Sequence, residues 1–95
     1  MPEDIDVQHD AAQQRFVALV DGVRAELDYE QRGDVLCLTH TGVPPEIGGR
    51  GIAGELMRTA LEYARANGLR VVPSCAYAAS YIERHPQYQD LVVVT

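Results

Sequence analysis

The chain has 95 residues, 46% of them hydrophobic, which fits one folded domain over residues 1–95 and argues against disorder. Its net charge of −6 argues against a general nucleic-acid binder, which carries a basic stripe. No apolar run is long enough to span a membrane, and the acidic N-terminus lacks the apolar core of a signal peptide, so we expect a cytoplasmic protein. The cysteines, Cys37 and Cys75, are too few and too far apart for a metal site, and a cytoplasmic disulfide is not expected.

The first half of the chain has the pattern of antiparallel strands. After four frayed residues, the expected strands cover residues 5–9 (weak, or an extended arm), 15–20, 23–30 and 35–41. Asp21-Gly22 is a two-residue hairpin signal, and a second turn is expected over residues 31–34. In the strand over 23–30, apolar and charged side chains alternate, which predicts one buried face and one wet face. These features predict an antiparallel meander.

The spacing of apolar residues changes in the second half of the chain from the alternation of strands to the spacing of a helix. Apolar residues between Gly51 and Asn67 follow helical spacing, and Asn67-Gly68 is a helix stop. A short buried strand is expected over 69–73, a second helix over 76–84 that ends before Pro86, and a last strand or docked tail over 90–95. The predicted fold class is α+β (mixed α/β): a meander, a phosphate-binding loop, and then a helix, a strand and a helix.

The loop before the first helix is the most informative segment of the chain. Residues 43–54 read Val-Pro-Pro-Glu-Ile-Gly-Gly-Arg-Gly-Ile-Ala-Gly. Gly48, Gly49 and Gly51 let the backbone approach a ligand closely. The helix that follows offers unpaired N–H groups and the positive end of its dipole, so the segment predicts a phosphate or diphosphate site.

Two familiar phosphate loops fit this segment poorly. Residues 49–54 match the dinucleotide pattern G-x-G-x-x-G letter for letter. That pattern requires a glycine turn directly after a first strand and an acidic residue at the end of the next, but two prolines intervene here and residues 69–75 hold no acid. A Walker loop is excluded because Glu55-Leu56 stands where Lys-Ser/Thr is needed.

A third interpretation rests on resemblance. The pattern Val43-x-Pro45-Glu46-x-x-Gly49-x-Gly51-Ile52-Ala53, between a strand and an amphipathic helix, resembles the acetyl-CoA-binding signature of the GNAT acetyltransferase superfamily. Three more segments narrow the likeness to the small stand-alone GNAT-like N-acetyltransferase domain proteins. They are His40-Thr41-x-Val43-Pro44, Pro73-Ser74-Cys75-x-Tyr77 and Tyr81-Ile82-x-Arg84-His85-Pro86. The resemblance covers residues 16–91 and implies a truncated GNAT-like fold, without the N-terminal helices of the larger enzymes.

The resemblance also implies a cofactor, acetyl-CoA, and its binding residues. Pantetheine would pair with the strand backbone around Thr41–Val43, and the diphosphate would meet the N–H groups of Gly48–Ala53. The implied cofactor residues are Thr41, Val43, Gly48, Gly49, Arg50, Gly51, Ile52 and Ala53. Gly48 departs from the family pattern, which has Arg or Gln there, and Arg50 is the obvious substitute cation or else a solvated surface residue.

Three residues are candidates for the chemistry of acetyl transfer. Cys75 precedes the second helix, where a thiol can act as nucleophile or acid, although a free cysteine is also a common small core residue. By resemblance Tyr81 stands where larger GNAT enzymes have a general acid, and otherwise it packs the helix onto the sheet. His40 could take a proton from the amine, or be a rim histidine. We expect these three residues to arrive at one place.

The sequence thus leaves three functional hypotheses. The first is an N-acetyltransferase that moves acetyl from acetyl-CoA to an amine of a small molecule or peptide, in a monomer or homodimer. The second is a non-catalytic acyl-CoA-binding or sensor module that has lost the acceptor pocket. The third is a small interaction domain that uses the loop for another phosphate ligand.

Overall fold

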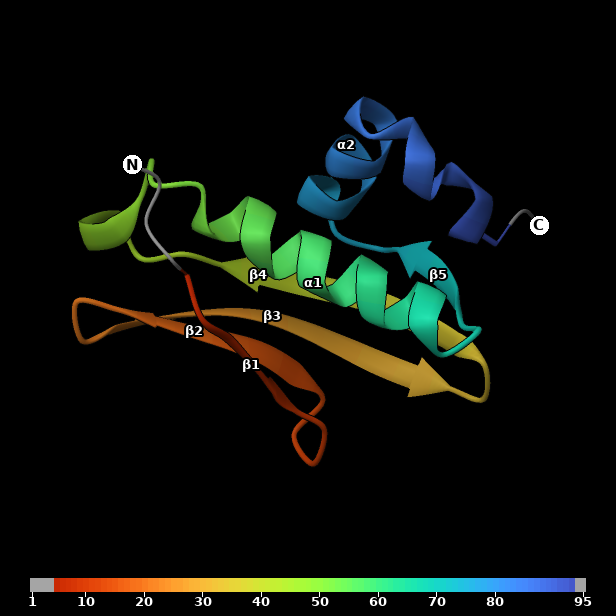
Figure 1. Cartoon of the computed structure of the whole chain (residues 1–95), viewed down its shortest axis with the longest axis horizontal. Coiled ribbons are helices and arrows are strands. Elements are labelled where there is room, and N and C mark those ends of the chain that lie inside the picture. Colours follow the sequence, from red (N-terminus) through yellow and green to blue (C-terminus); the bar gives the residue numbers. More distant parts are fainter. Residues whose placement is uncertain (1–4, 94–95) are drawn as a thin grey trace.

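The computed structural model describes residues 5–93 (Figure 1). The strands are β1 (Val7–Asp10), β2 (Arg15–Val20), β3 (Val23–Arg32), β4 (Val35–Gly42) and β5 (Arg70–Pro73). The α-helices are α1 (Ile52–Ala66) and α2 (Ala76–Arg84), and two 3-10 helices are η1 (Pro45–Ile47) and η2 (Pro86–Leu91). The mixed α+β class and the order of elements predicted from the sequence are confirmed.

Within the described residues, the strands form one five-stranded sheet in the order β1-β2-β3-β4-β5. The first four strands pair antiparallel, as a meander, whereas β5 pairs parallel with β4 because α1 crosses over between them. The Asp21-Gly22 hairpin is confirmed: both residues have positive φ, 52° and 76°, which a tight hairpin turn requires. The first strand is displaced to Val7–Asp10, and residues 1–4 lie outside the described part.

The second turn is shorter than the sequence predicted. A turn over residues 31–34 is wrong, because Gln31 pairs with Leu36 and Arg32 pairs with Val35, so that β3 runs two residues further. Only Gly33-Asp34 connect the strands, and Gly33 takes a φ of 62°. The polar composition of residues 31–34 concealed a two-residue hairpin, which differs from Asp21-Gly22 in that only its first residue has positive φ.

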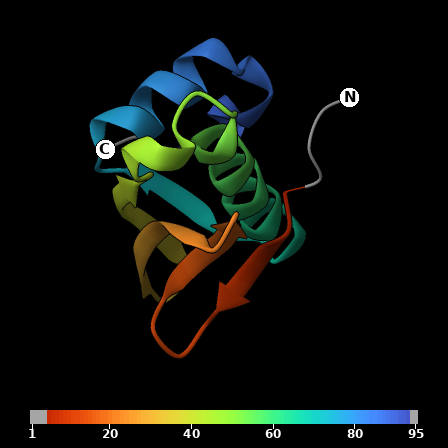
Figure 2. The same ribbon diagram turned by 90° about the vertical axis from the view of Figure 1, so that its left-hand side faces the viewer.

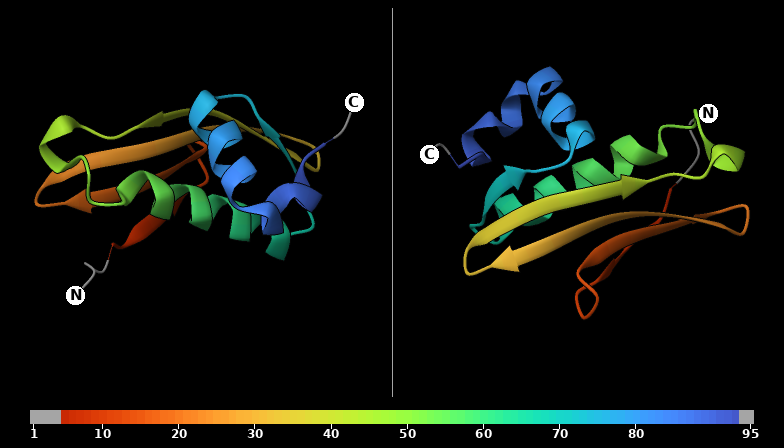
Figure 3. Two further views of the ribbon diagram at one scale, coloured as in Figure 1. Left: turned by 90° about the horizontal axis from the view of Figure 1, so that it is seen from above. Right: turned by 180° about the vertical axis from the view of Figure 1, so that it is seen from behind.

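Both helices lie on one side of the sheet, as Figures 2 and 3 show. Helix α1 contacts all five strands and also touches α2. Its apolar face is buried against the sheet, through Ile52, Leu56, Met57, Ala60, Leu61 and Ala64. The other face of the sheet carries the charged residues of β3, so the wet face predicted from the alternation of residues 23–30 is confirmed.

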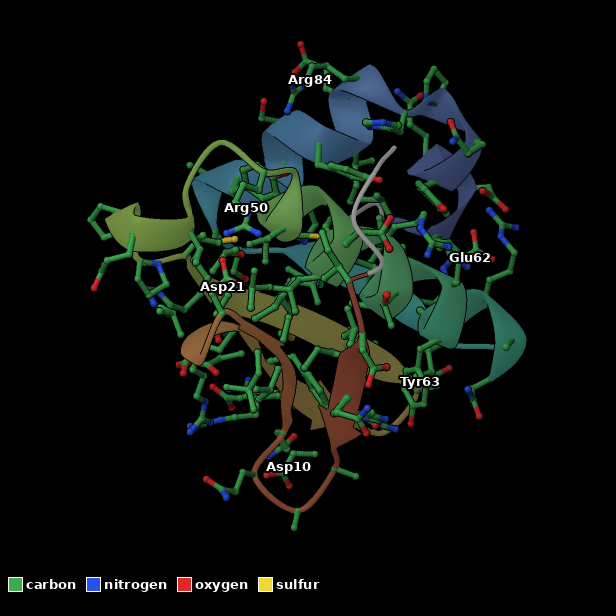
Figure 4. All side chains as sticks on the ribbon, turned by 60° about the vertical axis from the view of Figure 1, so that its left-hand side comes forward. Asp10, Asp21, Arg50, Glu62, Tyr63 and Arg84 are labelled. Carbon is green, nitrogen blue, oxygen red and sulfur yellow. The ribbon has the colours of Figure 1, made fainter. Side chains whose placement is uncertain are left out.

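The C-terminal segment is a 3-10 helix followed by one bridge, not a strand. Val92 bridges to Val71 beside β5, and residues 94–95 of the predicted strand or tail lie outside the described part. Tyr88 anchors η2 by donating a hydrogen bond to Glu62 of α1 over 2.6 Å, and Glu62 is labelled in Figure 4. Burial, followed by this carboxylate, raises the pKa of Tyr88 to about 12.

An aromatic cluster ties β1 to the core at the far end of α1. The His9 ring stacks on Phe16 with centroids 4.3 Å apart, and meets Tyr63 edge-on at 4.5 Å. The Tyr29 hydroxyl is hydrogen-bonded to Nε2 of His9. Burial lowers the pKa of His9, and Asp10 partly opposes that shift. Asp10 and Tyr63 are labelled in Figure 4.

No helix among the described residues is long and apolar enough to cross a membrane.

Candidate functional site

The loop between β4 and α1 presents a set of unpaired backbone donors. Gly49 and Gly51 have φ of 77° and 76°, the left-handed region that favours glycine, and Gly51 is the N-cap of α1. The first N–H that bonds within the helix is that of Glu55, which donates to Gly51 over 3.1 Å. Within residues 5–93, the N–H groups of Ile52, Ala53 and Gly54 therefore have no acceptor, as at any exposed helix start.

Space above the loop is open to a ligand. A Cβ built on Gly49 or Gly51 would have no atom of the described residues within 4 Å. Unpaired N–H groups at a helix N-terminus, with no side chain in the way, form the donor set that binds phosphate oxygens. These residues therefore fit the diphosphate of CoA.

Gly48 does not belong to this donor set in the structure. Its φ of −67° is open to any residue, and its N–H already donates to Pro45 over 3.1 Å, which closes the short helix η1. Its Cβ would lie 3.4 Å from that same carbonyl oxygen. Gly48 was among the expected diphosphate contacts, and the structure uses its N–H to shape the loop instead.

Arg50 ties the loop to the β2–β3 hairpin turn, which lies at the same end of the sheet. Its Nη1 donates to Oδ2 of Asp21 in the β2–β3 hairpin turn over 2.7 Å, and Figure 4 shows the two side chains together. The Arg50 side chain is 28% exposed and that of Asp21 72%. Arg50 is thus a cation beside the loop that is held by a carboxylate on a neighbouring turn.

β4 extends well past its parallel partner. The β4–β5 pairing runs from Val35 opposite Arg70 to Leu38 opposite Pro73, and the Cys75 N–H then donates to the Leu38 carbonyl over 3.0 Å. Within the described residues, the rest of β4 pairs only with β3. Residues 39–42 therefore form an open strand edge that leads directly into the loop, and an extended ligand can pair with such an edge.

A β-bulge reverses the faces of β4 at this open edge. Leu38 pairs with Tyr29, but His40 pairs with Asp28, so Thr39 is the extra residue. Thr41 consequently lies opposite the buried Leu27, on the helix side of the sheet. His40 lies on the outer side, although plain alternation from Leu38 would place it inside.

Cys75 meets Thr41 on the helix side of the open edge. The Cys75 Sγ lies 3.6 Å from Oγ1 of Thr41 and accepts the N–H of Ala78 over 3.4 Å, so the thiol caps α2. Its side chain is half-buried. A thiol in this position faces a strand hydroxyl and the N-terminus of a helix at the same time.

Tyr81 lies between the two helices. It is 7% exposed, its ring stacks on His85 with centroids 3.9 Å apart, and within residues 5–93 it shares no hydrogen bond with Cys75. Burial raises the pKa of Tyr81 and also that of the half-buried Tyr77. A Cβ on Gly54 would lie 3.7 Å from the Tyr77 hydroxyl and 3.8 Å from Cε2 of Tyr81, so both tyrosines lie against the first turn of α1.

His40 faces a hollow on the outer side of the sheet. The hollow has a volume of about 350 Å³ and is lined by Arg24, Glu26, His40, Gly42, Val43 and Pro44. The sequence led us to expect Cys75, Tyr81 and His40 at one place; the structure puts His40 on the face of the sheet away from the other two, because the Thr39 bulge turns it outward. Arg24 and Glu26 were identified from sequence only as part of a wet strand face.

Comparisons with known proteins agree with this geometry. Residues 15–91 match the family model described as GCN5-related N-acetyl-transferase. The chain is 36% identical over 90 residues to Protein NATD1 of Gallus gallus and of Homo sapiens, covering 92% of this chain and 82% and 80% of those proteins. It also resembles the solution NMR structure of a GCN5-like protein from Staphylococcus aureus. That match has a TM-score of 0.74 and 28% identity, over 95% of this chain and 89% of the other.

The family model spans the chain from β2 to η2, so it includes β4, the glycine loop, α1, β5 and α2, which build the site. The fold and the sequence relatives point the same way. The chain belongs to the GCN5-related N-acetyltransferase family.

Proposed function

We propose that this protein binds acetyl-CoA and transfers its acetyl group to an amine. The observation that carries the proposal is the meeting of three features at one end of β4. These are the unpaired N–H groups at the start of α1, the open strand edge at residues 39–42, and the Cys75 thiol against Thr41. Family membership supports the choice of ligand, because acetyl-CoA is the usual acetyl donor of such domains.

Each part of the site would hold a different part of the donor. The N–H groups of Gly51 to Gly54 would take the diphosphate, with Arg50 beside them as a cation. The open edge at Thr41–Val43 would pair with the amide groups of the pantetheine arm. Acetyl-CoA supplies an activated thioester when it is bound.

Acetyl transfer from a thioester to an amine requires two proton transfers by the protein's residues. One N–H bond and the C–S bond break, and one C–N bond and one S–H bond form, so a proton must leave the amine and a proton must reach the sulfur. Cys75 lies on the helix side of the open edge with Thr41, and His40 lies one residue away on the outer side. We assign the acid role to the thiol and the base role to the imidazole.

A non-catalytic acyl-CoA-binding or sensor module is the second candidate. Two observations favour it: Tyr81 is committed to packing between the helices, and His40 is separated from Cys75 by the sheet. In that case the loop and the open edge would still bind CoA, but no acetyl group would leave the bound donor faster than it does in buffer.

Calorimetry with acetyl-CoA and with CoA, followed by chromatographic measurement of CoA release in a mixed pool of primary amines, tests both candidates. Wild type is compared with Cys75→Ala and with Cys37→Ala, a half-buried cysteine in β4 where it pairs with Val72 of β5. We expect binding in all three proteins and release that is lost only in Cys75→Ala. Binding without release in all three proteins, wild type included, would favour the sensor, and no binding at millimolar acetyl-CoA would refute the proposed function.

A further inference from the structure

We propose that the hollow on the outer face of the sheet binds the acceptor, and that this acceptor is a small zwitterion, an amine that carries its own carboxylate. This inference rests on the proposed function, because it names the substrate of the same site. The hollow has about 350 Å³, the size of a small-molecule pocket, and it places a guanidinium, a carboxylate and an imidazole around one space.

These three side chains have unused hydrogen-bonding capacity. Arg24 and Glu26 form an ion pair at 3.7 Å, beyond hydrogen-bond distance, and neither they nor the His40 ring makes a hydrogen bond to another described residue. Three other arginines, Arg32, Arg58 and Arg65, each bond a carboxylate at 2.9–3.1 Å, whereas Arg15, like Arg24, has an ion pair without a hydrogen bond. A positive and a negative side chain that line one hollow and make no hydrogen bond can each bind the opposite charge of a zwitterion.

Gly42 shapes the hollow. A Cβ at Gly42 would lie 3.1 Å from Nε2 of His40, which is a tight contact, so a larger residue there would push the imidazole aside by a few tenths of an ångström. The same strand segment carries Thr41, whose hydroxyl contacts the Cys75 thiol on the other side of the sheet. The hollow therefore lies directly across the open edge of β4 from the thiol.

Each group then has a part in recognition. The Arg24 guanidinium can donate two hydrogen bonds to the carboxylate of the acceptor, and Glu26 can accept hydrogen bonds from its ammonium group. His40, beside Glu26, is placed to take the proton that the amine must lose before it forms the C–N bond. A peptide amine or an alkylamine lacks the nearby carboxylate and leaves Arg24 without its partner.

Binding is measured first, without the acetyl donor. Backbone amide shifts of His40, Gly42 and Val43 are followed by NMR while glycine, β-alanine or 4-aminobutyrate is added at millimolar concentration. Methylamine, ethylamine and propylamine, which are the same compounds without the carboxylate, are added in parallel. Glycinamide stands in for a peptide N-terminus. The variants are Arg24→Gln and Glu26→Gln, with Arg32→Gln in the same strand as the matched control.

We expect at least one amino acid to shift these amide signals in wild type. The matched amine and glycinamide should bind wild type at least about tenfold more weakly than that amino acid, and the Arg24→Gln variant should bind the amino acid at least about tenfold more weakly than wild type does. Arg32→Gln should bind as wild type does. Equal binding of amines and amino acids, or no shift with any of them, would overturn the inference even if acetyl transfer is observed. Shifts that behave as expected in a protein that releases no CoA would refute the proposed enzyme activity and leave the zwitterion site standing.

Discussion

Replacing Gly51 by alanine tests the geometry of the phosphate loop most directly. Gly51 has a φ of 76°, and a Cβ there would have no atom of the described residues within 4 Å. The cost of the substitution is therefore conformational and not steric. Holding a non-glycine residue in the left-handed region costs about 1–2 kcal/mol, and the lower entropy of the unfolded chain returns about 0.4–1 kcal/mol. We expect Gly51→Ala to lower the free energy of unfolding by about 1 kcal/mol.

Gly54→Ala is the matched control, with the opposite sign. Gly54 lies inside the first turn of α1, and its Cβ would meet the Tyr77 hydroxyl at 3.7 Å and Cε2 of Tyr81 at 3.8 Å, which are ordinary contacts. Alanine is a better helix residue than glycine, so Gly54→Ala should raise the free energy of unfolding by about 0.5–1 kcal/mol.

Urea unfolding followed by circular dichroism measures both variants against wild type, with equal m-values as the condition for comparison. For a domain of this size, 1 kcal/mol corresponds to about 4–8 °C in melting temperature. If Gly51→Ala were as stable as wild type, or if both variants moved in the same direction, the left-handed cap at Gly51 would be refuted. Calorimetry with acetyl-CoA on the same proteins then shows whether disfavouring the left-handed conformation at Gly51 also weakens ligand binding.

Three further outcomes follow from the structure. Because burial lowers the pKa of His9 below 6.5, the unfolded chain binds more protons; the urea midpoint should fall as pH drops below 6.5, and a His9→Phe variant should lose part of that slope. Asp21→Asn should bind acetyl-CoA a few-fold more tightly at low salt, because it removes a carboxylate that competes with the diphosphate for Arg50, and weaker binding would show that the Arg50–Asp21 pair orders the loop instead. Leu27→Ala, at a fully buried position, should cost about 2–5 kcal/mol in urea unfolding, whereas Leu19→Ala, 67% exposed, should stay within about 0.5 kcal/mol.

The elements that the sequence predicted well are those specified by local chemistry. Asp21-Gly22 makes its turn through two residues that tolerate positive φ, and α2 spans the predicted residues 76–84 because Pro86 prevents the helix from continuing. The glycine loop was recognisable for the same reason, since Gly49 and Gly51 each need a conformation that other residues avoid.

The features that the sequence did not reveal depend on pairing between strands. The extra residue at Thr39 exists only relative to β3, and nothing in the composition of β4 marks it. Because of that one residue, His40 lines the hollow with Arg24 on the outer face of the sheet and does not share the helix side of the sheet with Cys75. The contact between Cys75 and Thr41 likewise depends on the parallel pairing of β5 with β4, which joins segments more than thirty residues apart.

This parallel pairing also has a kinetic consequence. The four strands of the meander join neighbours in the chain, whereas β5 can be added only after the fifteen residues of α1 have crossed the sheet. Contacts of high sequence separation are the slow ones to close, so we expect β5 and the start of α2 to dock last. The thiol, the loop and the open edge of β4 would then become a site only in the final step of folding. Hydrogen exchange should find β5 opening before the central hairpin does.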